Sequence, residues 1–166
     1  MNKDKSSYKK INGKNYRKNV GIVVFNSDKK VLFCKRLNSK IGSWQFPQGG
    51  IDVGETEDVA ALRELAEETG ITSAQIVYSD KNWYKYDFPE EVRKSKKYYE
   101  DVNGQIQKWF LVKFTGNDDE IKIPSEEFED YKWTDLSLTL VNEVISFKQE
   151  VYKEVITKFL KVLKDI

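Results

Sequence analysis

Three glutamates, Glu64, Glu67 and Glu68, have the types and spacing to do chemistry together. In a helix, at roughly 100° per residue, they fall within an arc of about 100°. Carboxylate oxygens are the ligands that hard metal ions prefer, so such a face could hold divalent cations. An acidic helix face is also typical of plain solvated surface, and spacing alone leaves both interpretations open.

The helix that must carry these glutamates has clear end signals. Thr56 suits its N-cap, and Gly70 followed by Ile71 matches a glycine C-cap. Ala60 and Ala61 are expected on the acid face, where small side chains would leave room for a metal-bound polyanion. The opposite side should face the core, and its apolar or small residues are Val59, Leu62, Leu65, Ala66 and Thr69.

Two features beside the glutamates strengthen the metal hypothesis. Gly49 and Gly50 precede the helix, and a backbone carbonyl at a glycine can approach a cation without a Cβ in the way. Arg63 adjoins the first glutamate and could orient a carboxylate through paired hydrogen bonds.

Composition removes several competing chemistries. The chain has 166 residues, no histidine and one cysteine, Cys34, which excludes an internal disulfide, zinc sites that need histidine and Ser-His-Asp triads. Its 39% apolar and 33% charged residues are typical of soluble globular proteins. Without a long apolar run or an apolar signal core, we expect a cytoplasmic protein with no membrane association.

The remaining pattern predicts one α/β unit. A hairpin is expected over 19–35, shorter strands over 44–46, 75–86, 107–114 and 130–133, and an irregular surface excursion over 87–104. A long C-terminal helix follows, with an apolar residue every fourth position at Phe147, Val151, Val155, Phe159 and Leu163. Residues 1–12 are expected to form a basic tail with some flexibility, and 13–166 one domain. The lysines of the tail could steer an anionic ligand inward.

The whole glutamate segment matches a known motif. It reads Gly49, five residues, Glu55, seven residues, then Arg63-Glu64-Leu65-x-Glu67-Glu68-x-Gly70-Ile71. This resembles, at every defined position, the Nudix box of the Nudix hydrolases. The resemblance implies a Nudix-type α/β/α sandwich with a mixed β-sheet. It also implies hydrolysis of a nucleoside diphosphate linked to another group, assisted by two or more Mg²⁺ or Mn²⁺ ions.

The resemblance also assigns roles within the box. Glu64, Glu67 and Glu68 would be metal ligands, and the Gly49 carbonyl would add another. The structural residues of the motif would be Glu55, Arg63 and Gly70. Bound divalent ions of this kind neutralise polyphosphate and activate a water for attack, with a glutamate as base, so histidine is not needed.

Segments outside the box resemble the bacterial RNA pyrophosphohydrolases. They are Tyr16-Arg17-Lys18-Asn19-Val20-Gly21, Trp44-Gln45-Phe46-Pro47-Gln48-Gly49-Gly50-Ile51-Asp52, 104–110 and Ser146-Phe147-Lys148. Members of that family remove pyrophosphate from the 5′-triphosphate end of RNA. The monophosphate they leave is attacked more easily by ribonucleases, which promotes mRNA decay.

Matching positions extend the site beyond the box. Glu127 would be a further metal ligand or the general base, acting with Glu64 and Glu67 in catalysis. The substrate contacts implied are Arg17, Arg36 and Lys148 for phosphates and Ile145 and Phe147 for a nucleobase. Two departures, Lys18 where the family has proline and Ile106 where it has a basic residue, bear on substrate affinity rather than chemistry.

Several alternatives remain at the level of sequence. A dinucleoside polyphosphate hydrolase, acting on compounds such as diadenosine tetraphosphate, would share the Trp-Gln-x-Pro-Gln-Gly-Gly segment. A module that binds nucleotides or RNA without hydrolysis is the non-enzymatic option. Phe147 could belong to the core, and Arg36 and Lys148 could be surface charges. The expected partner is 5′-triphosphorylated RNA or a nucleoside polyphosphate, bound by a monomer.

Overall fold

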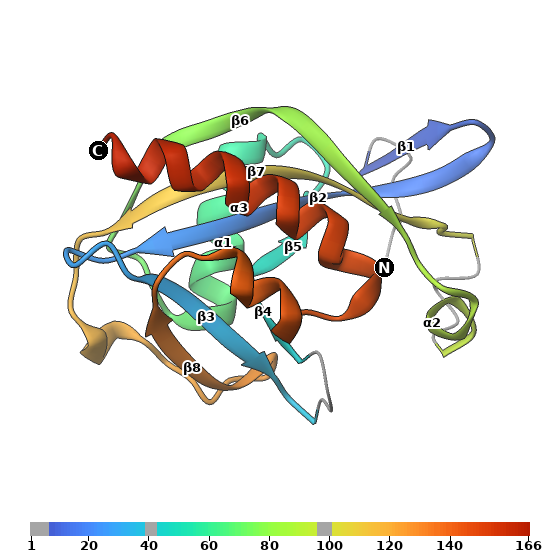
Figure 1. Cartoon of the computed structure of the whole chain (residues 1–166). Helices are drawn as coiled ribbons and strands as arrows, with labels where there is room; N and C mark the ends of the chain where they lie inside the picture. Colours follow the sequence, from blue (N-terminus) through green and yellow to red (C-terminus); the bar gives the residue numbers. More distant parts are fainter. Residues whose placement is uncertain (1–6, 39–42, 96–100) are drawn as a thin grey trace.

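The computed structural model describes residues 7–38, 43–95 and 101–166. Within them, one sheet lies between a helix on one face and a longer C-terminal helix on the other (Figure 1). The strands are β1 (Tyr8–Ile11), β2 (Lys14–Phe25), β3 (Val31–Arg36), β4 (Trp44–Gln45), β5 (Gln48–Gly50), β6 (Ala74–Asp87), β7 (Gly104–Phe114) and β8 (Phe128–Thr134). The helices are α1 (Glu57–Thr69), α2 (Glu90–Ser95) and α3 (Gln149–Lys164), with 3₁₀ turns η3 (Asp118–Glu120), η4 (Leu138–Glu143) and η5 (Ser146–Lys148).

The sheet is mixed, as the resemblance to the Nudix hydrolases implies. Its order is β4-β3-β2-β7-β6, with β1 and β5 also pairing with β2 and β8 with β3. The parallel pair is β2 with β7, in register from Tyr16 opposite Gly104 to Phe25 opposite Lys113. β2 also pairs antiparallel with β5, which fixes Gly49 and Gly50 beside the sheet centre.

Burial on both faces explains the composition of the two central strands. Residues 20 to 25 of β2 and 109 to 112 of β7 are almost all apolar and buried. A near-continuous apolar run, rather than strict alternation, is what a strand covered on both sides requires. The two helices that cover these faces complete the α/β/α sandwich.

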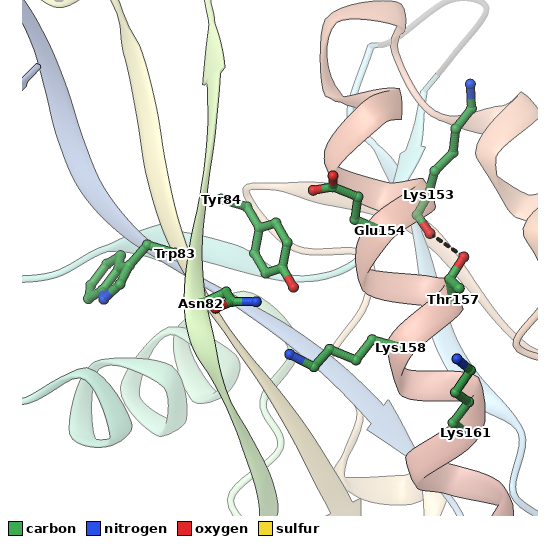
Figure 2. Close-up of a pocket in the computed structure, with 8 residues that line it drawn as sticks. All are labelled: Asn82, Trp83, Tyr84, Lys153, Glu154, Thr157, Lys158 and Lys161. Carbon is green, nitrogen blue, oxygen red and sulfur yellow. Dashed lines mark hydrogen bonds between the residues drawn. The ribbon is translucent and has the colours of Figure 1, made fainter. Parts of the chain in front are cut away.

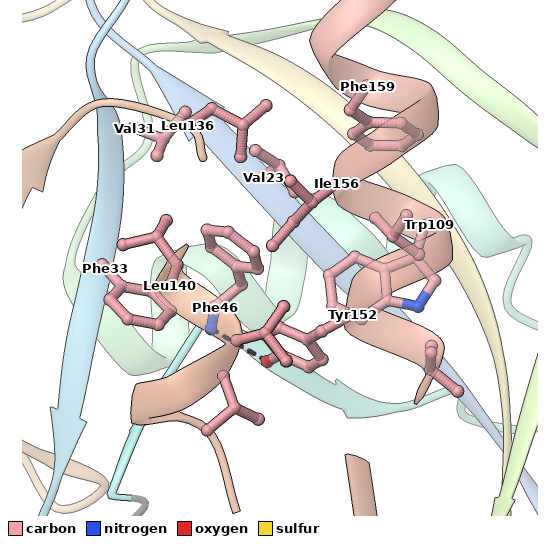
Figure 3. Close-up of a cluster of buried hydrophobic side chains, with 14 of the residues drawn as sticks. Val23, Val31, Phe33, Phe46, Trp109, Leu136, Leu140, Tyr152, Ile156 and Phe159 are labelled. Atoms are coloured by element: carbon pink, nitrogen blue, oxygen red, sulfur yellow. Dashed lines mark hydrogen bonds between the residues drawn. The ribbon is translucent and has the colours of Figure 1, made fainter. Parts of the chain in front are cut away.

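The face under α3 holds the larger aromatic core (Figure 3). Phe46 and Tyr152 stack with their ring centroids 5.3 Å apart, and the Phe46 N–H donates to the Tyr152 hydroxyl at 3.0 Å. The predicted four-residue apolar repeat is confirmed, because Val151, Val155, Phe159 and Leu163 are all buried. Phe147 differs: it lies in η5, ahead of the helix, and is only half buried.

The face under α1 corrects one prediction. Ala60 and Ala61, expected on the acid face, are fully buried against the sheet, whereas Val59 and Leu62, expected in the core, are 54% and 38% exposed. Small alanines let the helix approach the sheet closely, and the sheet-facing side then continues through Leu65 to Thr69. The side chains of Glu64 and Glu68 consequently point toward the sheet rather than away from it.

The two ends of α1 follow the sequence signals. Thr56 is the extended N-cap residue, although its side chain makes no capping hydrogen bond. Gly70 adopts a left-handed conformation with φ of 82°, and its N–H donates to the Ala66 carbonyl. A glycine is favoured there because a side chain disfavours positive φ.

Other expectations are modified by the structure. A flexible tail is predicted over 1–12, but in the structure Tyr8–Ile11 form strand β1 and pair with β2. Residues 1–6 lie outside the described part. The excursion predicted over 87–104 contains helix α2, and 96–100 lie outside the described residues. In the part of the chain that the structure describes, no helix is long and apolar enough to span a membrane.

Candidate active site

A cleft of about 450 Å³ opens where α1, β5, β7 and η5 meet. It gathers predicted site residues from six separate segments of the sequence. The predicted residues that line it are Arg17, Arg36, Gly49, Glu64, Glu68, Glu127, Ile145, Phe147 and Lys148.

Two glutamates form the acid wall of this cleft. Burial raises the pKa of Glu64 to about 7, against the lowering effect of the neighbouring Arg63 guanidinium. Burial also raises the pKa of Glu68 well above its usual value, and the nearby carboxylates of Glu127 and Glu64 add to the rise. The Gln48 N–H donates to Glu68 Oε2 at 3.3 Å. Two carboxylates are thus held in a setting that disfavours their charge.

Gly49 makes this arrangement possible. A Cβ at that position would overlap the carboxyl group of Glu64. A Cβ at Gly50 would instead meet the guanidinium group of Arg17. The glycine pair therefore admits one acidic and one basic side chain to the same stretch of backbone.

Arg63 braces the acid wall from the solvent side. Its Nε and Nη2 donate to the two carboxyl oxygens of Glu55 at 2.6 and 2.9 Å, and Nη2 also donates to the Gly50 carbonyl at 2.9 Å. Its Nη1 donates to Glu64 at 3.1 Å and Glu67 at 3.2 Å. The hydrogen bond from Arg63 lowers the pKa of Glu55, which stays ionised. These hydrogen bonds join α1 to Gly50 at the end of β5.

Glu67 and Glu127 lie differently from the two wall glutamates. Glu127, just before β8, is exposed and lines both the cleft and a neighbouring hollow of about 430 Å³. Glu67 lines that second hollow and not the cleft, and its side chain is 59% exposed. Glu64 and Glu68 separate the two spaces, so all four predicted acidic ligands border one ridge.

The donor chemistry at this ridge fits hard divalent cations. Carboxylate oxygens, with the Gly49 backbone carbonyl, are the donors that Mg²⁺ and Mn²⁺ prefer. Among the described residues no three acidic, cysteine or histidine side chains are close enough to form a ready-made metal group. Arg63 binds two of the carboxylates, Glu64 and Glu67. The metal cluster therefore stays a prediction.

Basic side chains line the same cleft as the glutamates. Lys148 is only 5% exposed, so the surface-charge alternative is wrong for this residue. Its ammonium group donates to Gln45 Oε1 at 3.2 Å and Gln48 Oε1 at 3.3 Å. Burial lowers the pKa of Lys148 to about 7, and Arg36 acts in the same direction. β2, β3 and η5 thus supply the basic side chains that line the cleft, Arg17, Arg36 and Lys148.

Aromatic side chains form the far end of the cleft. The ring of Phe147 lies 5.7 Å from that of Tyr86 and 6.1 Å from that of Phe88, centroid to centroid. Lys148 Nζ lies within 6.0 Å of the centroids of Phe147 and Tyr86. With Ile145, these rings make an apolar surface with one cation at its edge, which suits a flat heterocycle.

Sequence reasoning missed a chain of buried amides under the cleft. Gln107 is fully buried, accepts from Trp109 Nε1 at 3.2 Å and donates to Asn19 at 2.8 Å and to Gln48 Oε1 at 3.4 Å. Gln48 Nε2 donates to Gln105 at 3.3 Å, and Gln105 also accepts from the hydroxyl of Tyr86. These amides could have been predicted from the sequence, because they are polar residues within otherwise apolar strands and a buried amide needs hydrogen-bond partners.

Taken together, the walls can bind a substrate with three distinct parts. Carboxylates and a backbone carbonyl can hold metal ions, three cations can bind phosphate oxygens, and an aromatic end can receive a base. No uncharged ligand would use all three surfaces.

The family model described as NUDIX domain matches residues 15–155 of the chain. A curated relative, Nudix hydrolase 26 of Arabidopsis thaliana, named as chloroplastic, is 46% identical over 151 residues, covering 87% of this chain and 69% of the relative. An RNA pyrophosphohydrolase of Rickettsia prowazekii is 41% identical over 146 residues, covering 87% of this chain and 89% of the relative.

A solved structure shares the fold at lower identity. The dihydroneopterin triphosphate pyrophosphohydrolase of Escherichia coli aligns with a TM-score of 0.64 and 19% identity, covering 85% of this chain and 95% of that one. At that identity the likeness supports the arrangement of the elements alone.

Proposed function

The chain belongs to the Nudix hydrolase family, and from that premise we propose that it removes pyrophosphate from the 5′-triphosphate end of RNA to leave a 5′-monophosphate. The observation that carries the proposal is the three-part cleft, in which carboxylates, cations and an aromatic end face one space. The Rickettsia relative, named as an RNA pyrophosphohydrolase and 41% identical, supports the choice of substrate.

The residues of the cleft divide the work. Arg17, Arg36 and Lys148 bind the phosphate oxygens and orient the chain of phosphates. Phe147 and Ile145 hold a base near the 5′ end. Bound Mg²⁺ or Mn²⁺ ions, held by the four glutamates and the Gly49 carbonyl, would neutralise the polyphosphate and make a water molecule more acidic.

Proton transfer falls to the carboxylates. Glu127 is exposed at the cleft, so its carboxylate can take the proton of the attacking water. Glu67 and Glu64 complete the catalytic set, with Arg63 orienting both through Nη1. Glu55 and Gly70 act structurally, the first as the partner of Arg63 and the second as the end of α1.

The test compares two substrates. Purified protein with Mg²⁺ or Mn²⁺ is incubated with 5′-triphosphorylated RNA and, separately, with diadenosine tetraphosphate, and the products are resolved. We expect pyrophosphate and 5′-monophosphorylated RNA, with slower cleavage of the dinucleotide. Rapid cleavage of the dinucleotide with intact RNA would favour the dinucleoside polyphosphate hydrolase instead. Tight RNA binding without any product would favour the non-enzymatic module.

Three finer statements belong to the same proposal. We place the protein in the cytoplasm, acting on mRNA to promote its decay, and as a monomer of 19.4 kDa. Light scattering after size exclusion tests the last statement, and a mass near twice that value would contradict it. Deletion of the gene should raise the fraction of triphosphorylated 5′ ends among cellular transcripts.

A further inference from the structure

A second concavity lies between β6 and α3, away from the acid wall (Figure 2). We call it the β6–α3 groove; its volume is about 690 Å³. The residues that line it are Asn82, Trp83, Tyr84, Lys153, Glu154, Thr157, Lys158 and Lys161. In Figure 2 the side chains of Tyr84 and Lys158 point toward each other across the groove, while Trp83 points to the opposite side of β6.

Cations predominate along this groove. Three lysines line it against one carboxylate, Glu154. Lys158 is tied to the buried Asp80 at 2.6 Å, so its charge is already matched. Lys153 pairs with Glu150 at 3.0 Å, but both side chains are exposed, at 53% and 86%, and such a pair is weak. Among the ion pairs of the described residues, none involves Lys161. Lys161 can therefore bind an added anion directly, and Lys153 can do so by leaving its weak pair with Glu150.

The groove and the cleft lie along the same two elements, β6 and the segment that runs from η5 into α3. Tyr84 and Tyr86 are alternate residues of β6, and both pack on the α3 side of the sheet. Tyr86 lines the cleft and Tyr84 lines the groove. On the other side, α3 begins directly after Phe147 and Lys148 of the cleft, and Lys153 lies little more than one turn later. A ligand leaving the aromatic end of the cleft can therefore follow β6 and α3.

The chemistry of the groove selects the kind of ligand. Lysines on one helix bind phosphates without regard to base sequence, and the phenol ring of Tyr84 offers a face for stacking. A single RNA strand presents both groups at regular intervals. A mononucleotide carries one base and one chain of phosphates, which the cleft alone accommodates.

We propose that the RNA chain downstream of its 5′-terminal nucleotides lies in the β6–α3 groove, with Lys153 and Lys161 on its phosphates. This inference rests on the proposed function, because it extends the same substrate beyond the catalytic cleft. The groove raises affinity for longer RNA, and the cleft alone serves a dinucleotide.

The experiment measures kcat/KM for a 5′-triphosphorylated dinucleotide and for a 5′-triphosphorylated RNA of about ten nucleotides. We compare the wild-type protein with Lys153→Gln/Lys161→Gln. The wild type should prefer the longer RNA by roughly 10-fold at low salt. The double variant should lose that preference through KM and keep the wild-type rate on the dinucleotide. For the longer RNA, the slope of log KM against log salt concentration should be smaller by about 1.4 in the double variant, because two lysine–phosphate interactions are removed.

Two matched single variants distinguish an effect of the groove on RNA binding from an effect of the total charge of the protein. Lys161→Glu and Lys113→Glu change the total charge equally, and Lys113 is exposed on β7, outside the groove. Lys161→Glu should raise KM for the longer RNA, and Lys113→Glu should not. Thermal unfolding of all variants should stay within about 2 °C of the wild type, as expected for exposed sites.

The outcomes are distinguishable. The proposed RNA path along the groove would be refuted if the wild type and the double variant had equal KM values for the longer RNA. It would also be refuted if the two single variants had equal effects. In either case the proposed function would be unaffected. A wild-type protein that hydrolyses neither RNA would overturn both the proposed function and the path built on it.

Discussion

At the scale of single residues, Glu64 and Glu68 occupy positions that are unfavourable for a carboxylate. Glu68 is buried, and its neighbours Glu127 and Glu64 are also acidic. An ionised group in such a place costs stability unless a cation accompanies it. The fold therefore gives up some local stability to hold this pair of acids, which is the cost expected if the two carboxylates bind cations.

Replacing Glu68 tests this cost. Because its pKa is raised in the folded state, the protein loses stability as pH rises above the ordinary carboxyl value near 4.5. Glu68→Gln carries no charge and can still accept the Gln48 N–H. In EDTA at about pH 7.5 its melting temperature should rise by about 2–4 °C, or about 1 kcal/mol, while kcat should fall at least about 100-fold. Calorimetry and turnover assays measure both, and a variant that is less stable and still active would refute the assignment.

The two glycines give a second prediction at this scale. Gly49→Ala should displace Glu64 and lower kcat by about 100-fold, because the new Cβ overlaps the carboxyl group. Gly50→Ala should displace the flexible end of Arg17 and raise KM by about 10-fold with little change in kcat. Steady-state kinetics on one RNA substrate separates the two effects. The same kinetic defect in both variants would show that backbone distortion, rather than the displaced side chain, is responsible.

The residues that line the cleft could be predicted from the sequence, but the buried hydrogen-bond partners beneath them could not. Glu64, Arg63 and Gly49 carry a motif with defined spacing, so their grouping followed from the sequence. The partners of Gln107 come from elsewhere, since Asn19 is 88 residues away along the chain. Pairing across such a separation depends on the register of β2 with β7, which local patterns do not encode.

At the scale of elements, α1 shows how local periodicity can mislead. The apolar residues Val59 and Leu62 suggested the core face, yet the fully buried Ala60 and Ala61 define it. Alanine is a weak signal of burial because it is also a common surface residue in helices, whereas close packing on a sheet demands small side chains. The strands and the apolar repeat of α3 were predicted well, since both bury a large and regular apolar surface.

The contact between β6 and α3 provides a test at this scale. Burial would raise the pKa of Asp80, but hydrogen bonds from Lys158, Tyr84 and Asn82 lower it below its ordinary 3.8. Lys158→Met leaves that buried carboxylate without its cation. The free energy of unfolding should fall by about 1–3 kcal/mol at neutral pH, less than for a fully buried pair because the Lys158 side chain is 35% exposed.

The pH dependence of this effect has a defined sign. A lowered pKa contributes stability above about 3.8, and that contribution is lost as pH falls through the folded-state value. The difference between wild type and Lys158→Met should therefore shrink in acid, as urea unfolding at about pH 7 and about pH 3 would show. Lys153→Met, which breaks the exposed pair with Glu150, is the control and should cost no more than about 0.5 kcal/mol.

At the scale of the whole molecule, the site joins distant parts of the chain. β2, β3, β5, α1 and η5 each contribute to the cleft, so a ligand bound there contacts elements from distant parts of the sequence. Such a ligand stabilises the folded state by mass action, because the unfolded chain cannot reproduce its contacts.

Metal addition and removal should therefore change stability as well as activity. Mg²⁺ or Mn²⁺ at about 100 times its dissociation constant should stabilise the protein by about 2.7 kcal/mol, raising the melting temperature by about 5–10 °C. Glu64→Gln/Glu68→Gln should lose most of this shift, and EDTA should abolish turnover of the wild type. An equal melting shift in the double variant would place the ions elsewhere.

The parallel pairing of β2 with β7 has a consequence for synthesis of the protein on the ribosome. Residues that contact each other across this pair are separated by 88 positions, and β5 with Gly49 and Gly50 pairs with the same β2. Bringing the two strands together across so long a loop costs conformational entropy, and their pairing cannot begin before both strands have been synthesised. The nascent chain thus cannot complete the cleft before β7 and the segments that follow it have left the exit tunnel, and until β7 emerges α1 can pack against β2 and β5 alone.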